Sequence, residues 1–197
     1  MYTEAVTATG HFEIPARIRE EMRGCSWRDE PRCPRFEALR LVRVQYRGFD
    51  GAVQLGELIV HTELADEVVA IFAEIFAAGF PIESMRRIDE FAADDNASMA
   101  ANNTSAFNYR VVEGTSQLSQ HALGRAIDIN PVQNPWLRAG RVDPPAGREY
   151  LDRSHTRPGM LVRPDPVIDA FTRVGWQWGG DLAQPDYHHF SKPIAPT

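Results

Sequence analysis

The sequence predicts an α+β fold in a single domain, in which a small and mostly antiparallel sheet is flanked by helices and joined by long loops. Two observations support this fold class. Patterns typical of strands bracket an early amphipathic helix, whereas in a parallel α/β sheet strands and helices would alternate along the chain. The chain also has 197 residues, of which 43% are hydrophobic, and this is enough apolar material for one core.

The chain begins with a segment that lacks a clear pattern, and a hairpin follows. Residues 1–35 are rich in Pro, Arg and Glu, and we expect an extended, irregular arm that lies on a domain formed by residues 36–197. Apolar residues alternate imperfectly over 39–46 and again over 53–60, on either side of the turn sequence FDG. This arrangement predicts a β-hairpin.

The clearest helix follows the hairpin. Apolar residues recur at helical spacing over 62–79, where Thr62 is suited to be the N-cap and Gly79 to end the helix. Residues 80–88 then read as a strand. The small polar residues 92–105 predict a loop that is long enough to suggest a function.

The second half of the chain is expected to hold strands, a long excursion and a last helix. Residues 106–112 and 125–130 have the composition of strands. Many Pro, Gly and Arg residues over 131–165 predict a long surface excursion, and residues 165–175 predict a helix. Residues 176–192 then form a loop that leads into a short strand.

Composition restricts the partners and the compartment. The formal net charge is −6, which argues against a nucleic acid partner, and no apolar run is long enough to span a membrane. The N-terminal residues show no basic start followed by an apolar run, so no signal peptide is predicted. Cys25 and Cys33 either close a small disulfide loop or remain free thiols, and two cysteines exclude a four-cysteine zinc site. We expect a monomer.

The stretch SQHALGRAID, residues 119–128, combines an imidazole and a carboxylate around a glycine. Gly124 allows a sharp turn between His121 and Asp128, and strand alternation places the small Ala126 on the same face as Asp128. An aspartate between two isoleucines is costly to bury without a strong partner, and a cation is one such partner. The pair alone leaves two readings open, a metal site and a capped turn.

A third ligand has to come from another part of the chain, and the sequence DYHHF is the best source. Neighbours on a strand point to opposite faces, so we expect only one of His188 and His189 to bind a metal. Asp186, just upstream, is well placed to act as a general base without occupying a coordination position. The other three histidines have no such context.

Two motifs together resemble the zinc D-alanyl-D-alanine carboxypeptidase family, which includes VanY-like carboxypeptidases, VanX-like dipeptidases and phage L-alanyl-D-glutamate endopeptidases. SQHALGRAID is similar to its pattern S-x-H-x-x-G-x-A-x-D. WGGDLAQPDYHHF resembles its Trp-Gly-Gly stretch followed by a carboxylate-x-x-His-Phe element. The runs NNTSAFNYR, AIDINP and GWQWGG resemble one branch of the family, and the resemblance spans about Leu41 to Phe190.

The resemblance implies a ligand set, a base and a cleft. It implies one zinc ion held by His121, Asp128 and His189, with Asp186 as the catalytic base and the long loops arranged around a zinc cleft. Many relatives have Glu in place of Asp186, and members of this branch often have Trp in place of Leu182. The first difference concerns the geometry of the attacking water, and the second concerns one wall of the cleft.

The resemblance also implies an arginine near the metal that holds or polarises the substrate. We favour Arg110, at the end of FNYR, over the alternatives Arg86 and Arg87 in SMRRID. Ser119 is expected either to donate a hydrogen bond near the substrate or to cap the turn before His121. Three aromatic residues are candidates for lining the cleft, with core packing as the alternative: Tyr109, Trp176 and Trp178.

The function implied is zinc-dependent hydrolysis of peptide bonds that involve D-amino acids, in peptidoglycan stem peptides or their precursors. Both a D-Ala-D-Ala carboxypeptidase and an L-Ala-D-Glu endopeptidase fit the motifs. A zinc-containing but catalytically idle cell-wall-binding module is the alternative, and a hydrolase of another amide ranks third. Such a substrate implies the cell envelope or the extracellular space, whereas action on precursors would place the protein in the cytoplasm.

Overall fold

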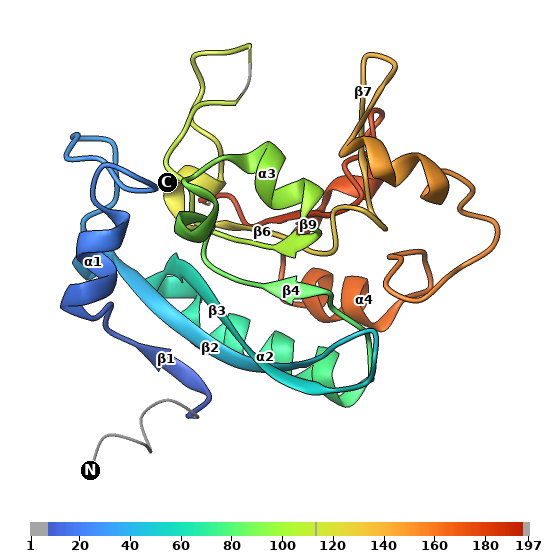
Figure 1. The fold of residues 1–197 in the computed structure, drawn as a ribbon, viewed down its shortest axis with the longest axis horizontal. Helices are drawn as coiled ribbons and strands as arrows, with labels where there is room; N and C mark the ends of the chain where they lie inside the picture. The colour runs from blue at the N-terminus through green and yellow to red at the C-terminus, as the bar shows by residue number, and fades with distance from the viewer. Residues whose placement is uncertain (1–7, 113, 195–197) are drawn as a thin grey trace.

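The larger sheet and the helix packed against it make up the base of the molecule. The computed structural model describes residues 8–112 and 114–194. Its larger sheet is antiparallel, with the order β1 (Gly10–Phe12), β2 (Leu39–Arg47) and β3 (Val53–His61). Helix α2 (Ala65–Ala77) packs against β2 (Figure 1). β2 and β3 pair along their whole length, which confirms the predicted hairpin.

Helix α2 lies where it was predicted, but its cap differs. The chain first makes a short 3₁₀ turn over Thr62–Leu64, so Thr62 is already helical. The His61 side chain caps this 3₁₀ turn, because its Nδ1 accepts a hydrogen bond from the Glu63 N–H. The N-cap position of α2 itself is Leu64, which makes no side-chain cap, so the prediction of Thr62 as N-cap is wrong. Gly79 follows the helix with φ +70°, as expected of a glycine that ends one.

The N-terminal segment is more regular than its composition predicted. Residues 8–35 contain β1 and also α1 (Ala16–Met22), which buries Ile18 and Met22. These two residues are four apart, so they share one face of the helix and join a second apolar cluster that includes Phe36. Charged residues around this short apolar pattern concealed it. The boundary between residues 35 and 36 remains a prediction.

The segment before the SQHALGRAID turn departs most from expectation. Strand β4 is limited to Ser84–Met85 and pairs in parallel with β5 (Asn103–Thr104). The expected loop 92–105 contains helix α3 (Asp95–Ala100), capped by the Asp94 carboxylate. Residues 106–112 form no regular strand, because their backbone N–H groups bond to several separate segments.

The second sheet carries the C-terminal half of the chain. Its order is β6 (Ala126–Asp128), β10 (His189–Ser191) and β9 (Gln177–Trp178), all antiparallel. Helix α4 (Pro166–Arg173), capped by Asp165, packs against α2. Within the expected excursion, β7 (Trp136–Arg138) and β8 (Arg141–Asp143) form a hairpin. The remaining 3₁₀ turns are Phe36–Ala38, Ile88–Phe91, His121–Leu123, Pro145–Tyr150 and Gly179–Asp181.

One core joins the two sheets. Ile127 and Phe190 from the second sheet, with Ile129 just after β6, are fully buried and belong to the same apolar cluster as the inner face of α2. This mixture of helices with small, mostly antiparallel sheets confirms the predicted α+β class. Among the described residues, no helix combines the length and apolar character of a membrane span. Cys25 and Cys33 are both free thiols.

Candidate metal centre and its cleft

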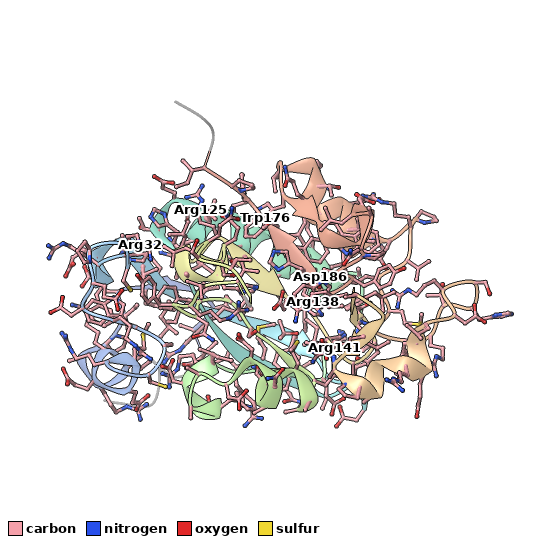
Figure 2. All side chains as sticks on the ribbon, turned by 90° about the horizontal axis from the view of Figure 1, so that it is seen from above. Arg32, Arg125, Arg138, Arg141, Trp176 and Asp186 are labelled. Atoms are coloured by element: carbon pink, nitrogen blue, oxygen red, sulfur yellow. The ribbon has the colours of Figure 1, made fainter. Side chains whose placement is uncertain are left out.

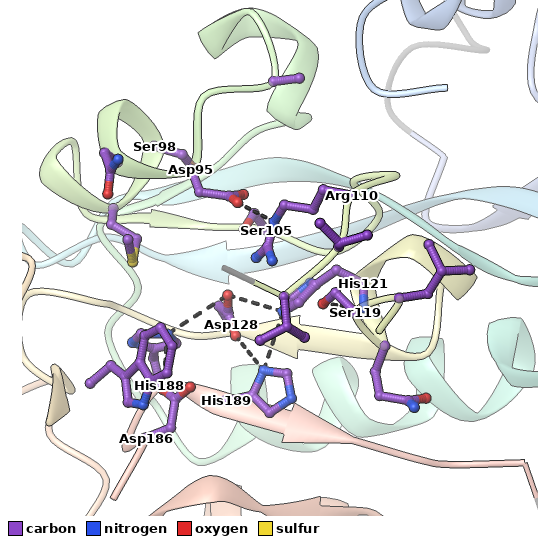
Figure 3. Close-up of a pocket in the computed structure, with 18 of the residues that line it drawn as sticks. Asp95, Ser98, Ser105, Arg110, Ser119, His121, Asp128, Asp186, His188 and His189 are labelled. Carbon is purple, nitrogen blue, oxygen red and sulfur yellow. Dashed lines mark hydrogen bonds and ion pairs between the residues drawn. The ribbon is translucent and has the colours of Figure 1, made fainter. Parts of the chain in front are cut away.

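Two neighbouring strands place a carboxylate and an imidazole side by side. In the register of β6 and β10, Asp128 lies directly opposite His189. The Asp128 Oδ1 atom is 3.0 Å from the Nδ1 atom of His189 (Figure 3). Ile127 and Ile129 hold β6 in the core, so the alternation of the strand turns Asp128 away from the core and toward the cleft.

His121 reaches the same point from the turn that precedes β6. Its Nε2 atom lies 3.2 Å from Asp128 Oδ2 and 3.2 Å from His189 Nδ1. Gly124, after the turn, has φ +67°, and a Cβ there would lie 2.7 Å from the backbone nitrogen of His61. Glycine is therefore required at this position both by the backbone conformation and by the close approach of β3.

The three side chains fit a zinc ion. Ligand atoms from His121, Asp128 and His189 all lie within 4.8 Å of one another, and two imidazoles with one carboxylate are a donor set that zinc favours. The Nδ1 atom of His121 contacts the carbonyl oxygen of Ala106, which fixes the ring and leaves Nε2 facing the cluster. Three protein ligands leave a coordination position for a substrate or water.

The electrostatics of the cluster favour a charged carboxylate. Burial alone raises the pKa of Asp128. The imidazoles of His121 and His188, with hydrogen bonds from His121 and His189, outweigh burial and hold that pKa well below its usual range. The carboxylate is therefore ionised, which is the form that binds metal.

Asp186 lies beside the cluster because of the Trp-Gly-Gly stretch. The Asp186 N–H donates to the carbonyl oxygen of Gly179, and a Cβ on Gly179 would lie 2.4 Å from the carbonyl oxygen of Asp186. Only glycine permits this approach. The Asp186 side chain is largely buried, and its Oδ1 atom lies 3.0 Å from Nε2 of His188. Burial lowers the pKa of His188, but the charges of Asp186 and Asp128 outweigh it and raise that pKa to about 9.

A cleft of about 620 Å³ opens over these groups. Six of the residues predicted from the sequence line it together: Arg110, Ser119, His121, Asp128, Asp186 and His189. Arg110 forms an ion pair with Asp95 of α3 on the side of the cleft away from Asp186 (Figure 3). The Ser119 Oγ atom accepts a hydrogen bond from the His121 N–H, so this residue both caps the turn and lines the cleft.

Three of the predicted substrate residues do not reach the cleft. Arg87 is 8% exposed and makes ion pairs with Glu21 and Glu57, and Arg86 lies over the ring of Phe91. The Tyr109 hydroxyl donates to Glu30. Trp178, like Trp176, is buried in the main core. Figure 2 labels Trp176 and Asp186 among all the side chains. Core packing, the alternative considered for the aromatic residues, is what the structure shows for Trp176 and Trp178, whereas Tyr109 is partly buried against the second apolar cluster. Arg87 joins α1 to β3.

Several residues of the cleft were not predicted. Trp136 lines it from β7, and its backbone forms a bridge with Asp186. Asp95 lines it from α3, and His188 lies behind Asp186. The polar run at 92–105 was an indication of function, but the partner of Asp95 depends on tertiary structure. Leu182 lines the cleft as the resemblance implied, and its side chain is exposed.

Comparison with known proteins gives one match. Residues 113–192 match the sequence model of a family described as D-alanyl-D-alanine carboxypeptidase. No curated protein and no solved structure matches the chain. The matched segment contains both motifs, the three residues of the metal cluster and Asp186. It confirms the resemblance of this part of the chain to the carboxypeptidase family and supports a peptidase function in general.

Proposed function

We propose that this chain, with its match to the D-alanyl-D-alanine carboxypeptidase family, is a zinc-dependent metallopeptidase. It hydrolyses peptide bonds that involve D-amino acids in peptidoglycan or its precursors. The observation that carries the proposal is the convergence of His121, Asp128 and His189 in a cleft that Asp186 and Arg110 also line. A cluster of ligands, a carboxylate outside that cluster and a cation in one cleft are the parts that amide hydrolysis needs.

Each residue has a distinct role in the proposed reaction. Zinc bound by the three ligands would polarise the scissile carbonyl group and make water more acidic. An Asp186 carboxylate oxygen takes a proton from the attacking water and passes it to the nitrogen of the leaving amine. The Arg110 guanidinium stabilises the negative charge that develops on the substrate oxygen, and Asp95 holds that guanidinium in place.

The cleft is consistent with a peptide substrate. Its volume of about 620 Å³ lies within the range of sites that bury most of a small ligand. Polar groups of α3 and Arg110 form one part, and the apolar side chains of Trp136 and Leu182 form another. A stem peptide, with its carboxylates and alanine methyl groups, has matching chemistry. Peptidoglycan as substrate places the protein at the cell envelope or outside the cell.

Cleavage of defined muropeptides tests the proposal. The purified protein with zinc is expected to release either a terminal D-alanine or the fragments of an L-Ala-D-Glu cleavage, and mass spectrometry distinguishes these two products. A chelator should abolish the reaction, and added zinc should restore it. Bound zinc without any cleavage would contradict the proposal and favour an idle binding module.

Asp186→Ala tests the base separately. We expect this variant to retain zinc and to lose about 100-fold or more in kcat, because a positioned general base contributes at least that factor. Asp152→Ala, at an exposed aspartate outside the cleft, is the matched control and should keep full activity. An Asp186→Ala variant with both zinc and full activity would contradict the assigned base.

A further inference from the structure

The second histidine of DYHHF is buried and lies outside the metal cluster. His188 is 3% exposed, and the group of possible ligands is made of His121, Asp128 and His189. Its ring lies between two segments of the chain. The Nδ1 atom is 2.9 Å from the carbonyl oxygen of Asn134, and the Nε2 atom is 3.0 Å from Oδ1 of Asp186. The same Nε2 atom is 3.8 Å from Oδ2 of Asp128, which is longer than a hydrogen bond.

Both nitrogens of this ring face groups that only accept hydrogen bonds. A backbone carbonyl oxygen accepts from Nδ1–H, and a carboxylate oxygen faces Nε2–H. Oδ1 of Asp186 is buried and accepts no well-aligned hydrogen bond from the described residues. The structure gives Asp186 Oδ1 a close ion pair with the His188 ring at 3.0 Å instead (Figure 3).

The carbonyl group that anchors His188 is itself held rigidly. Asn134 is fully buried, and its side-chain nitrogen donates to the carbonyl oxygens of Ile129, Asn130 and Gly159. Its side-chain oxygen accepts from the N–H of Leu161 and from the guanidinium of Arg153. With its side chain bonded on all sides, Asn134 has little freedom to move, and the ring that it holds shares this restriction.

We propose that His188 is a positioning residue that orients the Asp186 carboxylate toward the cleft. The rigid Asn134 holds the His188 ring in place, and the ring in turn restricts the movement of the carboxylate. Strand alternation explains why His189 points to the metal cluster while His188 points to the polar groups behind Asp186. The inference rests on the proposed role of Asp186 as the base. The proposal gives a role to the buried His188 imidazole, which is not one of the three candidate metal ligands.

Two substitutions separate the two polar ends of the ring, Nδ1 beside the carbonyl oxygen of Asn134 and Nε2 beside Asp186. In His188→Asn the amide nitrogen replaces Nδ1 and keeps the contact with Asn134, but nothing reaches Asp186. In His188→Gln the amide nitrogen replaces Nε2 and still reaches Asp186. We expect kcat to fall about 10- to 100-fold in the Asn variant, with little change in KM or zinc affinity, and to recover in large part in the Gln variant. His155→Asn, at an exposed histidine, is the control.

A second measurement does not depend on activity. Crystal structures of the zinc-loaded wild-type protein and of both variants should show the Asp186 carboxylate displaced in His188→Asn and retained in His188→Gln. An unchanged kcat, an unmoved carboxylate, or loss of zinc from a folded Asn variant would each overturn the proposal. If the wild-type protein bound zinc but cleaved nothing, the proposed function would fail, while the crystal structures would still decide whether His188 orients Asp186. Should the Asn variant fail to fold, the Gln variant keeps the test: a displaced carboxylate there would overturn the proposal.

Discussion

Asp128 shows how much chemistry the residues on either side of one side chain can reveal. A carboxylate between two buried isoleucines needs a strong partner, and this argument gave a reason to look for a cation, although His121 and Asp128 alone left a capped turn as the other reading. The structure adds His189, directly opposite in the sheet. The motif resemblance implied His189 as a ligand but not this pairing, since strand register across 61 residues of separation is not written in local sequence. The roles of these residues remain predictions.

The arginines mark the limit of sequence reasoning at this scale. The linear sequence is compatible with a place in the site for Arg110, Arg86 or Arg87, yet only Arg110 lines the cleft. The outcome depends on where each arginine finds its acidic partners, and Arg87 is the one that becomes buried with them. Arg87 finds Glu21 and Glu57, which come from α1 and β3, and no local pattern predicts that pair of contacts.

Alanine substitutions at Arg110 and Arg87 should affect different properties, activity at Arg110 and stability at Arg87. Arg110→Ala is expected to lower kcat/KM about 100-fold, as loss of an oxyanion donor does, with little change in Tm. Arg87→Ala removes the buried cation of a partly exposed ion-pair network and should cost about 1–3 kcal/mol of unfolding free energy, between the values for exposed and buried pairs, with the kcat of the remaining folded protein preserved. Steady-state kinetics and thermal denaturation of both variants check this. A large loss of kcat/KM in folded Arg87→Ala would contradict this assignment and indicate that Arg87 acts in the site.

Elements with a strong local signal were predicted well. The hairpin follows from alternation, and α2 and α4 lie within the ranges that the sequence predicted for helices. The errors fall on residues 8–35 and 92–112, where elements are short and their stability comes from distant contacts. Residues 106–112 have the composition of a strand, but their N–H groups bond to Ile59, His121 and Ser26 among others, and no single neighbouring strand pairs with them.

Two glycines that share a backbone conformation can test whether the turn before β6 requires glycine because β3 lies so close. Gly124 and Gly140 have φ +67° and +79°, but only Gly124 is crowded, since the space where a Cβ on Gly140 would lie is empty. Both alanine variants should lose about 1 kcal/mol through backbone strain. Gly124→Ala should lose about 1–3 kcal/mol more, because β3 must move, and should bind zinc more weakly because His121 and Asp128 separate.

Chemical denaturation and zinc titration of the two variants measure both effects. Gly140 lies in the β7–β8 hairpin, away from the metal cluster, so its variant should keep the zinc affinity of the wild-type protein. Equal losses of stability in the two variants, with equal zinc affinity, would show that the close approach of β3 does not matter for the turn.

At the scale of the whole molecule, the proposed metal centre joins parts of the chain that are far apart in sequence. His121 lies in the 3₁₀ turn before β6, whereas His189 lies in β10, close to the C-terminal end of the described residues. The unfolded chain holds these ligands apart, so zinc should bind the folded state far more tightly than the unfolded one. Removing zinc should therefore destabilise the entire fold as well as the site.

The size of this effect follows from linkage. At a free zinc concentration about 1,000 times the Kd, binding adds about 4 kcal/mol of stability. For a domain of this size each kcal/mol corresponds to about 2–4 °C, so a chelator should lower Tm by about 10 °C, and zinc should restore it. Differential scanning calorimetry with metal analysis measures both quantities. In His121→Ala the chelator should have no effect on Tm, and an equal shift in that variant would place the metal elsewhere in the protein.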